Sequence, residues 1–154
     1  MNKGIFIQMT GLSGAGKTTL ATAAREELVS RGIQNIEIID GDEYRAGLCS
    51  DLGFSKGDRN TNIRRLGFVG RVLARNNVIA IMSAINPYEE VRQEIGGKLV
   101  YIKTGLEAVI DRDVKGLYAK ALSGEIPNFT GISDPFEEPL AADLTIETDK
   151  GTIQ

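Results

Sequence analysis

The sequence predicts an α/β protein of three layers, in which helices cover both faces of a mostly parallel five-stranded sheet. Two observations support this fold class. Short apolar β-type runs alternate with longer segments that permit helices, and each run is nearly all apolar, as expected for strands buried on both faces. In order, the expected strands are Ile5–Met9, Ile36–Ile39, Val78–Met82, Leu99–Lys103 and Leu144–Ile146. The expected helices are Lys17–Ser30, Arg59–Asn76, Tyr88–Ile95 and Leu106–Asp111.

Length and composition predict one globular domain over residues 1–154. Hydrophobic residues make up 42% of the chain and charged residues 25%, which excludes fibrous and disordered classes. The net charge of −3 argues against general binding of nucleic acid, which requires a basic face. The run Val78–Met82 is too short to cross a membrane, and the single Cys49 permits no internal disulfide. We therefore expect a cytoplasmic protein without a nucleic-acid or membrane partner.

The first strand leads into a phosphate-binding loop. Residues 11–18 match the pattern GxxxxGK[ST], in which backbone N–H groups surround phosphates and the lysine reaches the β and γ oxygens. The helix that follows adds partial positive charge at its N-terminus. We expect Lys17 to be catalytic and to face solvent in the empty site, and Thr18 to place its hydroxyl on Mg²⁺. The expected ATP-binding residues are Gly11, Leu12, Ser13, Gly14, Ala15, Gly16, Lys17, Thr18 and Thr19.

The second strand ends in the sequence Asp40-Gly41-Asp42. The carboxyl ends of strands are where ligands bind in open α/β sheets, and the chain has no histidine to act as a base. One aspartate is therefore the best candidate to accept or orient a hydroxyl proton, and the other to hold Mg²⁺ through water. The alternative is a simple turn with a helix N-cap. Arg45 follows closely enough to face the same pocket from a first helical turn.

Residues 51–65 are dense in polar and positive side chains. Arginine suits phosphate and sulfate oxygens, and asparagine suits a ribose or a base edge. The alternative is a solvated helix face, which is favoured for Arg65, Arg71 and Arg75.

Residues 112–139 break the alternation of strands and helices. They contain three of the four prolines and at most one or two helical turns, around Leu117–Leu122. A loop of this length in a compact domain is usually functional or disordered. Because it lies between the fourth and fifth strands, a lid over the strand ends is favoured over a disordered insertion.

Five segments together resemble adenylylsulfate kinases: GLSGAGKTT at 11–19, DGDEYRAGL at 40–48, DLGFSKGDRNTNIRR at 51–65, DVKGLYAKAL at 113–122 and NFTGISDPFEEP at 128–139. The resemblance covers residues 4–148. It implies a P-loop kinase with a lid, using Mg²⁺ and transferring the γ-phosphate of ATP to the ribose 3′-hydroxyl of adenosine 5′-phosphosulfate (APS). It also implies a homodimer.

The resemblance implies roles for individual residues. Asp42 matches the family's proposed base, and Asp40 a water-mediated Mg²⁺ contact. Arg45, Arg59 and Asn62 match positions that hold the substrate, with Lys115 nearby in the lid. Phe54 and Phe129 match two rings that sandwich its adenine. Two aromatic residues on polar loops are unusual as core residues, which agrees with stacking on a base. The alternative is that each ring pins its loop to the core.

The chain departs from the family at three places. Where relatives have a phospho-accepting serine before Pro87, this chain has Asn86, which cannot form a phosphoester. We therefore expect direct transfer without a phosphoenzyme. The N-terminal extension of many relatives and their final helix are also missing. Two other functions stay open: a different small-molecule P-loop kinase, or a nucleotide-binding module with weakened catalysis.

Overall fold

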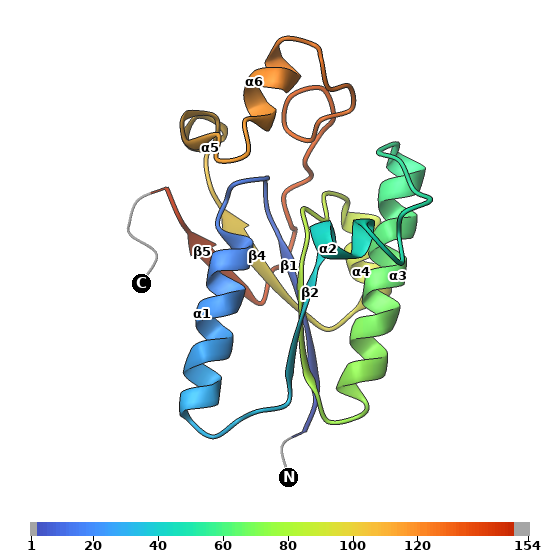
Figure 1. Cartoon of the computed structure of the whole chain (residues 1–154), viewed down its shortest axis with the longest axis vertical. Coiled ribbons are helices and arrows are strands. Elements are labelled where there is room, and N and C mark those ends of the chain that lie inside the picture. Colours follow the sequence, from blue (N-terminus) through green and yellow to red (C-terminus); the bar gives the residue numbers. More distant parts are fainter. Residues whose placement is uncertain (1–2, 150–154) are drawn as a thin grey trace.

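The computed structural model describes residues 3–149 and shows a five-stranded sheet between helices (Figure 1). The strands are β1 (Ile5–Thr10), β2 (Ile36–Asp40), β3 (Ile79–Ser83), β4 (Lys98–Lys103) and β5 (Leu144–Glu147). The helices are α1 (Lys17–Ser30), α2 (Gly41–Arg45), α3 (Lys56–Ala74), α4 (Glu89–Ile95), α5 (Leu106–Arg112) and α6 (Leu117–Leu122). The predicted fold class is confirmed, and most predicted bounds differ by only one or two residues.

The sheet has the order β2-β3-β1-β4-β5, and every pairing between these strands is parallel. All of their carboxyl ends therefore lie at one edge. That edge carries the loop between β1 and α1, the short helix α2 and the loop after β3. The sheet topology thus brings together segments that are far apart in the sequence.

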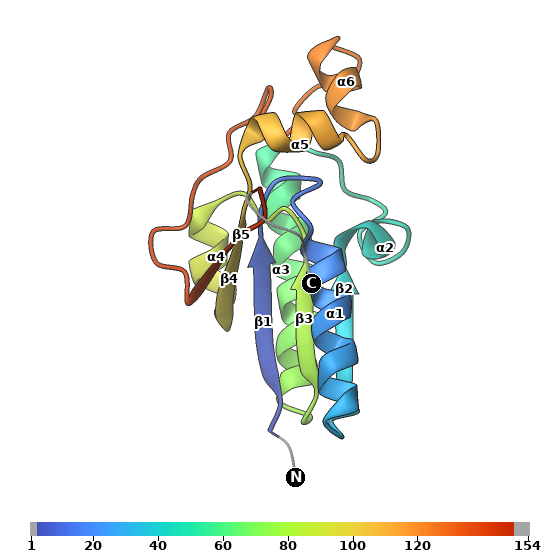
Figure 2. The same cartoon turned by 90° about the vertical axis from the view of Figure 1, so that its left-hand side faces the viewer.

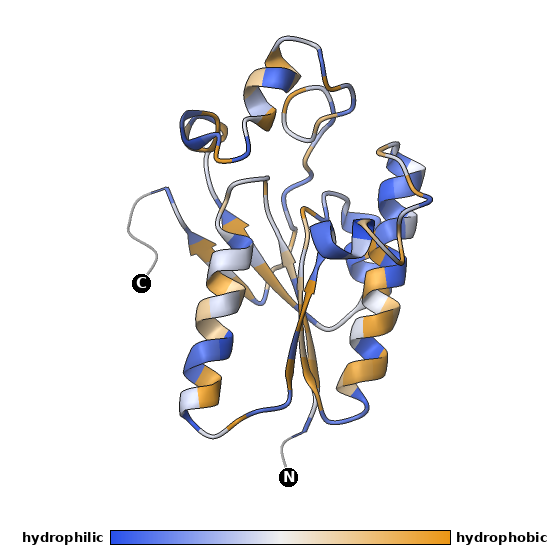
Figure 3. Cartoon of the chain, viewed as in Figure 1, coloured by the Kyte–Doolittle hydropathy of each residue, from blue (hydrophilic) through white to orange (hydrophobic). Residues whose placement is uncertain are grey.

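Helices cover both faces of the sheet (Figure 2). On one face, Ala21 of α1 packs with Met9 and Ile81 of the sheet. On the other face, Leu66 of α3 packs with Met82. Alternate residues of β3 therefore point to opposite faces, and both faces are buried, which explains why the strands are nearly all apolar (Figure 3).

Two helices begin where side chains cap them. Ser55 Oγ accepts a hydrogen bond from the Asp58 backbone N–H at 3.1 Å, so α3 begins at Lys56, three residues before the predicted start. Asp40 Oδ1 accepts from the Asp42 backbone N–H at 2.9 Å and caps α2. The N-cap that the sequence left as an alternative is therefore present.

The segment 112–139 lies above the carboxyl ends of the strands, at the top of Figure 1. It contains α6, as predicted. Its residues Tyr118, Ala121 and Phe129 form a small apolar core with Val109 of α5, and Leu12 of the phosphate-binding loop packs against this core. We call this segment the lid.

Within residues 3–149, no helix has the length and apolar character needed to span a bilayer. Residues 1–2 and 150–154 lie outside the described part, and the expectations about an N-terminal extension and a final helix stay predictions.

Candidate active site

A cavity of about 560 Å³ lies at the carboxyl edge of the sheet, between the phosphate-binding loop, α2, α3 and the lid. Its size falls in the range of small-molecule sites. Most of the predicted site residues line it: Ser13, Gly14, Gly16, Lys17, Thr18, Thr19, Asp42, Arg45, Phe54, Arg59, Asn62 and Lys115. Gly11, Leu12, Ala15, Asp40 and Phe129 were predicted for the site but are not among its lining residues.

The phosphate-binding loop needs its glycines for two different reasons. Gly14 (φ 80°) and Gly16 (φ 105°) have left-handed backbone conformations, which glycine adopts without steric cost. At Gly11, a Cβ atom would lie 2.6 Å from the carbonyl oxygen of Ile102 in β4. Gly11 therefore allows the loop to pack closely against the sheet, while Gly14 and Gly16 shape the part that faces the cavity.

Lys17 bonds to the phosphate-binding loop itself. Its side chain is buried, and Nζ donates hydrogen bonds to the carbonyl oxygens of Gly11 and Leu12, both at 2.8 Å. Burial, and to a lesser extent the charge of Lys115, lowers the pKa of Lys17 to about 7, although Asp42 and Asp40 oppose the shift. The prediction that Lys17 faces solvent is therefore wrong, because the loop's own carbonyl groups solvate the ammonium.

Two side-chain hydroxyls of the kind that bind Mg²⁺ lie next to this loop. The hydroxyls of Thr18 and Ser83 are 3.1 Å apart, where α1 begins beside the end of β3. Residues 3–149 contain no group of three or more His, Cys, Asp or Glu side chains that could hold a metal by themselves. The Thr18 hydroxyl fits Mg²⁺ that arrives with a nucleotide and takes its other ligands from phosphates and water. Asp40 caps α2 and is not among the residues that line the cavity.

Asp42 faces the cavity and is reached by the lid. Its side chain is 76% exposed, and Oδ2 forms an ion pair with Lys115 Nζ at 2.5 Å. The lid thus places a cation directly at the candidate base.

Two arginines surround the ring of Phe54. The guanidinium carbon of Arg45 lies 4.5 Å from the ring centroid and that of Arg59 lies 5.4 Å from it. Arg59 is buried and its Nε donates to the Phe54 carbonyl oxygen at 3.0 Å. Burial lowers the pKa of Arg59 below its ordinary value. Phe54 itself is 56% exposed, so the cavity wall has one partly open apolar ring with two cations beside it.

Asn62 lies on the same side of the cavity and is buried. Its Oδ1 atom finds no hydrogen-bond partner among the described residues. By contrast, Arg65 pairs with Asp51, and Arg71 Nη1 donates to the Ile95 carbonyl oxygen at 3.1 Å. Both lie outside the cavity lining, as expected for a helix face.

Phe129 lies in the core of the lid. It is 8% exposed and packs edge-on against Tyr118, with the ring centroids 5.0 Å apart. This is the arrangement of the alternative reading, in which the ring pins its loop. Stacking of Phe129 on a substrate base stays a prediction.

Asn86 is a buried part of the cavity wall. It has a φ of 53°, and Nδ2 donates to Gln8 Oε1 at 2.8 Å. Its carbonyl oxygen accepts from Thr10 Oγ1 at 2.8 Å and from Arg92 Nε at 2.9 Å. Asparagine tolerates this left-handed backbone better than most residues, so Asn86 has a structural role in the loop after β3.

Sequence reasoning missed Ser83 and Tyr118, which also line the cavity. Ser83 ends β3, and only the sheet order shows that β3 lies next to β1 and its loop. Tyr118 resembles an ordinary apolar helix residue in the sequence, and no local pattern distinguishes it.

Comparison with known proteins points to one family. The family profile described as adenylylsulphate kinase matches residues 3–147. The chain is 51% identical to an adenylyl-sulfate kinase of Deinococcus deserti, with 98% of this chain and 86% of that protein covered. It is 53% identical to an adenylyl-sulfate kinase of Chloroflexus aurantiacus, with 95% of this chain and 81% of that protein covered.

Solved structures agree. An APS kinase of Mycobacterium tuberculosis, in complex with AMPPNP and APS, superposes with a TM-score of 0.90 at 39% identity, covering 98% of this chain and 92% of that one. A hexameric APS kinase from Thiobacillus denitrificans gives a TM-score of 0.71 at 32% identity, covering 99% of this chain and 26% of that one.

Proposed function

The chain belongs to the adenylylsulfate kinase family, and we propose that it transfers the γ-phosphate of ATP to the 3′-hydroxyl of APS, giving 3′-phosphoadenylyl sulfate and ADP. One observation carries the proposal. A single cavity has a phosphate-binding loop on one side, Arg45, Arg59 and Asn62 on another, and Asp42 and Lys115 facing each other in it.

In this reaction ATP would bind with its β- and γ-phosphates at the loop. Lys17 would leave the carbonyl groups of Gly11 and Leu12 and bind phosphate oxygens, because phosphate offers a stronger acceptor. The N-terminus of α1 adds partial positive charge at the same place. Mg²⁺ bound with ATP would neutralise charge on the β- and γ-phosphates, with the Thr18 hydroxyl as a ligand and Asp40 contacting it through water.

APS would bind on the opposite side of the cavity. Arg45 and Arg59 would hold its charged phosphosulfate group, with Asn62 as a polar neighbour, and Phe54 would stack on its adenine. Phe129 remains our candidate for the second stacking ring, and this role requires the lid to reorganise from the packing that Phe129 now has with Tyr118.

Asp42 would accept the proton of the 3′-hydroxyl as that oxygen bonds to the γ-phosphorus and the bond from phosphorus to the β–γ bridging oxygen breaks. Lys115 would cover the transferred phosphoryl group, and catalysis would come from positioning and charge neutralisation. Transfer would be direct, because Asn86 has no hydroxyl to carry phosphate.

The decisive experiment measures ADP release with Mg²⁺ and ATP, with and without APS. We expect release that depends on APS, and its loss in Lys17→Ala. Equal release with a nucleoside or a short phosphorylated alcohol would indicate another kinase, and no release with any acceptor would indicate a binding module.

Three further assignments are proposals of the same kind. We propose that residues 1–154 act as one domain and that the protein is cytoplasmic. The family resemblance also supports a homodimer, whereas one solved relative is hexameric. Light scattering of the purified chain would measure its mass in solution and decide between these assemblies.

A further inference from the structure

The turn between α5 and α6 has a defined shape. Asp113 (φ 29°) and Gly116 (φ 68°) both have positive φ values, and Lys115 lies between them. The Asp113 carboxylate accepts hydrogen bonds from the backbone N–H groups of Tyr118 at 2.9 Å and Ala119 at 3.1 Å, which ties the turn to the start of α6. The position of Lys115 therefore depends on where α6 is held.

Tyr118 connects α6 to the phosphate-binding loop. Its hydroxyl donates to the carbonyl oxygen of Ser13 at 2.7 Å, and its ring packs edge-on against Phe129. Figure 2 shows α5 and α6 above the loop that joins β1 to α1. Leu12 of this loop also packs against the apolar core of the lid. Arg112 makes a second hydrogen bond to the loop, but its Nη1 is 3.4 Å from the Gly14 carbonyl oxygen and its side chain is exposed. The Tyr118 hydrogen bond is shorter and part-buried.

The Tyr118 phenol remains a hydrogen-bond donor under working conditions. Burial raises the pKa of the Tyr118 phenol well above its ordinary value, and the negative charge of Asp113 adds to the shift. The hydroxyl therefore keeps its proton and remains a donor. Because a peptide group is planar, holding the Ser13 carbonyl also restricts the orientation of the Gly14 N–H in the loop.

We propose that Tyr118 is a positioning residue for phosphoryl transfer: its hydrogen bond to Ser13 holds the lid turn on the phosphate-binding loop, so that Lys115 stays at Asp42. This inference rests on the proposed function. Lys115 and Ser13 belong to segments about a hundred residues apart, and Tyr118 links them through one hydroxyl. Binding of phosphate at the loop and the position of the Lys115 ammonium are thereby coupled.

The test is a double-mutant cycle with Tyr118→Phe and Lys115→Met. Tyr118→Phe keeps the ring packed on Phe129 and removes only the hydroxyl. We expect it to lower kcat roughly fivefold, as for the loss of one hydrogen bond of about 1 kcal/mol, with little change in KM for APS. In the Lys115→Met background, the same change should lower kcat by less than about twofold, because the residue through which Tyr118 acts is gone.

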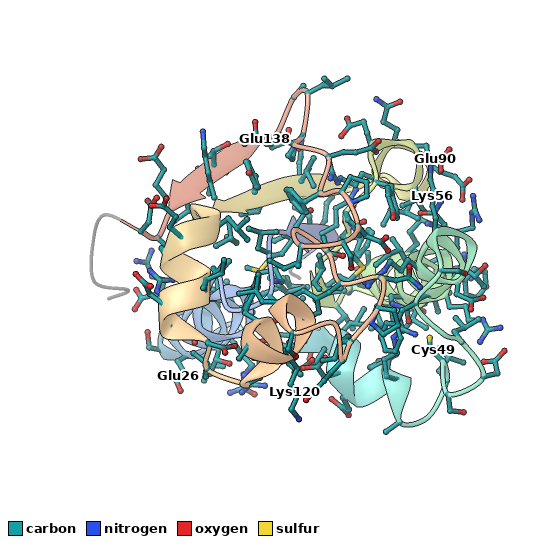
Figure 4. The ribbon with its side chains drawn as sticks, turned by 90° about the horizontal axis from the view of Figure 1, so that it is seen from above. Glu26, Cys49, Lys56, Glu90, Lys120 and Glu138 are labelled. Atoms are coloured by element: carbon teal, nitrogen blue, oxygen red, sulfur yellow. The ribbon has the colours of Figure 1, made fainter. Side chains whose placement is uncertain are left out.

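Two matched controls separate positioning from general damage. Tyr101→Phe removes a tyrosyl hydroxyl whose hydrogen bond goes to Glu138 Oε1 at 3.3 Å and not to the phosphate-binding loop. Lys120→Met removes a lid lysine on the outer side of α6 (Figure 4). Both should leave kcat unchanged. An equal loss from Tyr118→Phe in both backgrounds would overturn the proposal.

A measurement without turnover completes the test. Amide hydrogen exchange of residues 113–118 should be faster in Tyr118→Phe than in the unmodified chain, and unchanged in Tyr101→Phe. Unchanged exchange in Tyr118→Phe would also overturn the proposal. Absence of APS-dependent ADP release in the unmodified chain would instead refute the proposed function, and the exchange result would still decide whether Tyr118 holds the turn.

Discussion

Replacing Phe129 by alanine should destabilise the lid, whereas replacing Phe54 by alanine should leave the lid intact and weaken the binding of APS. Phe129 is 8% exposed in the lid core, whereas Phe54 is 56% exposed at the cavity. Truncating a buried phenylalanine costs about 3–5 kcal/mol, and the small lid core, with half-buried neighbours that can collapse, places Phe129→Ala near the lower value. Part of this cost is the edge-on contact with Tyr118, which contributes about 1 kcal/mol.

A loss of about 3 kcal/mol would raise the opening equilibrium of the lid more than about a hundredfold. Amide exchange of residues 117–134 measures this opening directly. The lid carries Lys115 and contacts the phosphate-binding loop through Tyr118. Phe129→Ala should therefore weaken the binding of both ATP and APS and raise both KM values. A ring that only stacked on the adenine of APS would change KM for APS alone.

Phe54→Ala leaves no cavity, so lid exchange and thermal unfolding should stay close to those of the unmodified chain. Loss of stacking should raise KM for APS by about 1–3 kcal/mol, which is roughly 5-fold to 150-fold, with little change in KM for ATP. If Phe129→Ala left lid exchange unchanged and raised KM for APS alone, the reasoning from burial would be refuted, because Phe129 would then stack on the adenine without holding the lid together.

The remaining predictions concern the reacting groups. Because the pKa of Lys17 in the free protein is lowered to about 7, its ammonium is lost above that pH, and kcat/KM for ATP should fall about tenfold per pH unit between about pH 7 and 9. Phosphate binding restores the charge, so calorimetry above pH 7 should show proton uptake; a flat profile would contradict this. Asp42→Asn should lower kcat roughly 10²-fold to 10⁴-fold with ATP affinity retained. Asp40→Asn keeps the cap of α2 and should mainly raise the Mg²⁺ concentration required; a greater loss of kcat in Asp40→Asn would reverse the two roles. Incubation with γ-labelled ATP alone should leave no acid-stable label, and label on Ser83 would disprove direct transfer.

The sequence was sufficient for the fold, for a physical reason, and with the family resemblance it also named most of the residues that line the cavity. Hydrophobic runs of strand length, separated by segments that permit helices, determine a parallel sheet, and parallel strands place all of their carboxyl ends at one edge. The residues that follow β1 and β2 therefore lie at the same edge, and the phosphate-binding motif and the family resemblance assigned Lys17 and Asp42 to one site there; both line the cavity. Helix ends were less predictable, because a single cap such as Ser55 moved the start of α3.

Only the tertiary structure decided which way the side chains point. Lys17 is buried because its ammonium donates to the carbonyl oxygens of the loop that precedes it. Phe54 and Phe129 have the same side chain on similar polar loops, yet one faces the cavity and the other is buried, because only the lid supplies a partner such as Tyr118. The Tyr118 contact with Ser13 joins segments about a hundred residues apart and leaves no trace in local composition. Local pattern determines which residues reach the edge of the sheet, and packing between distant segments determines what each one touches there.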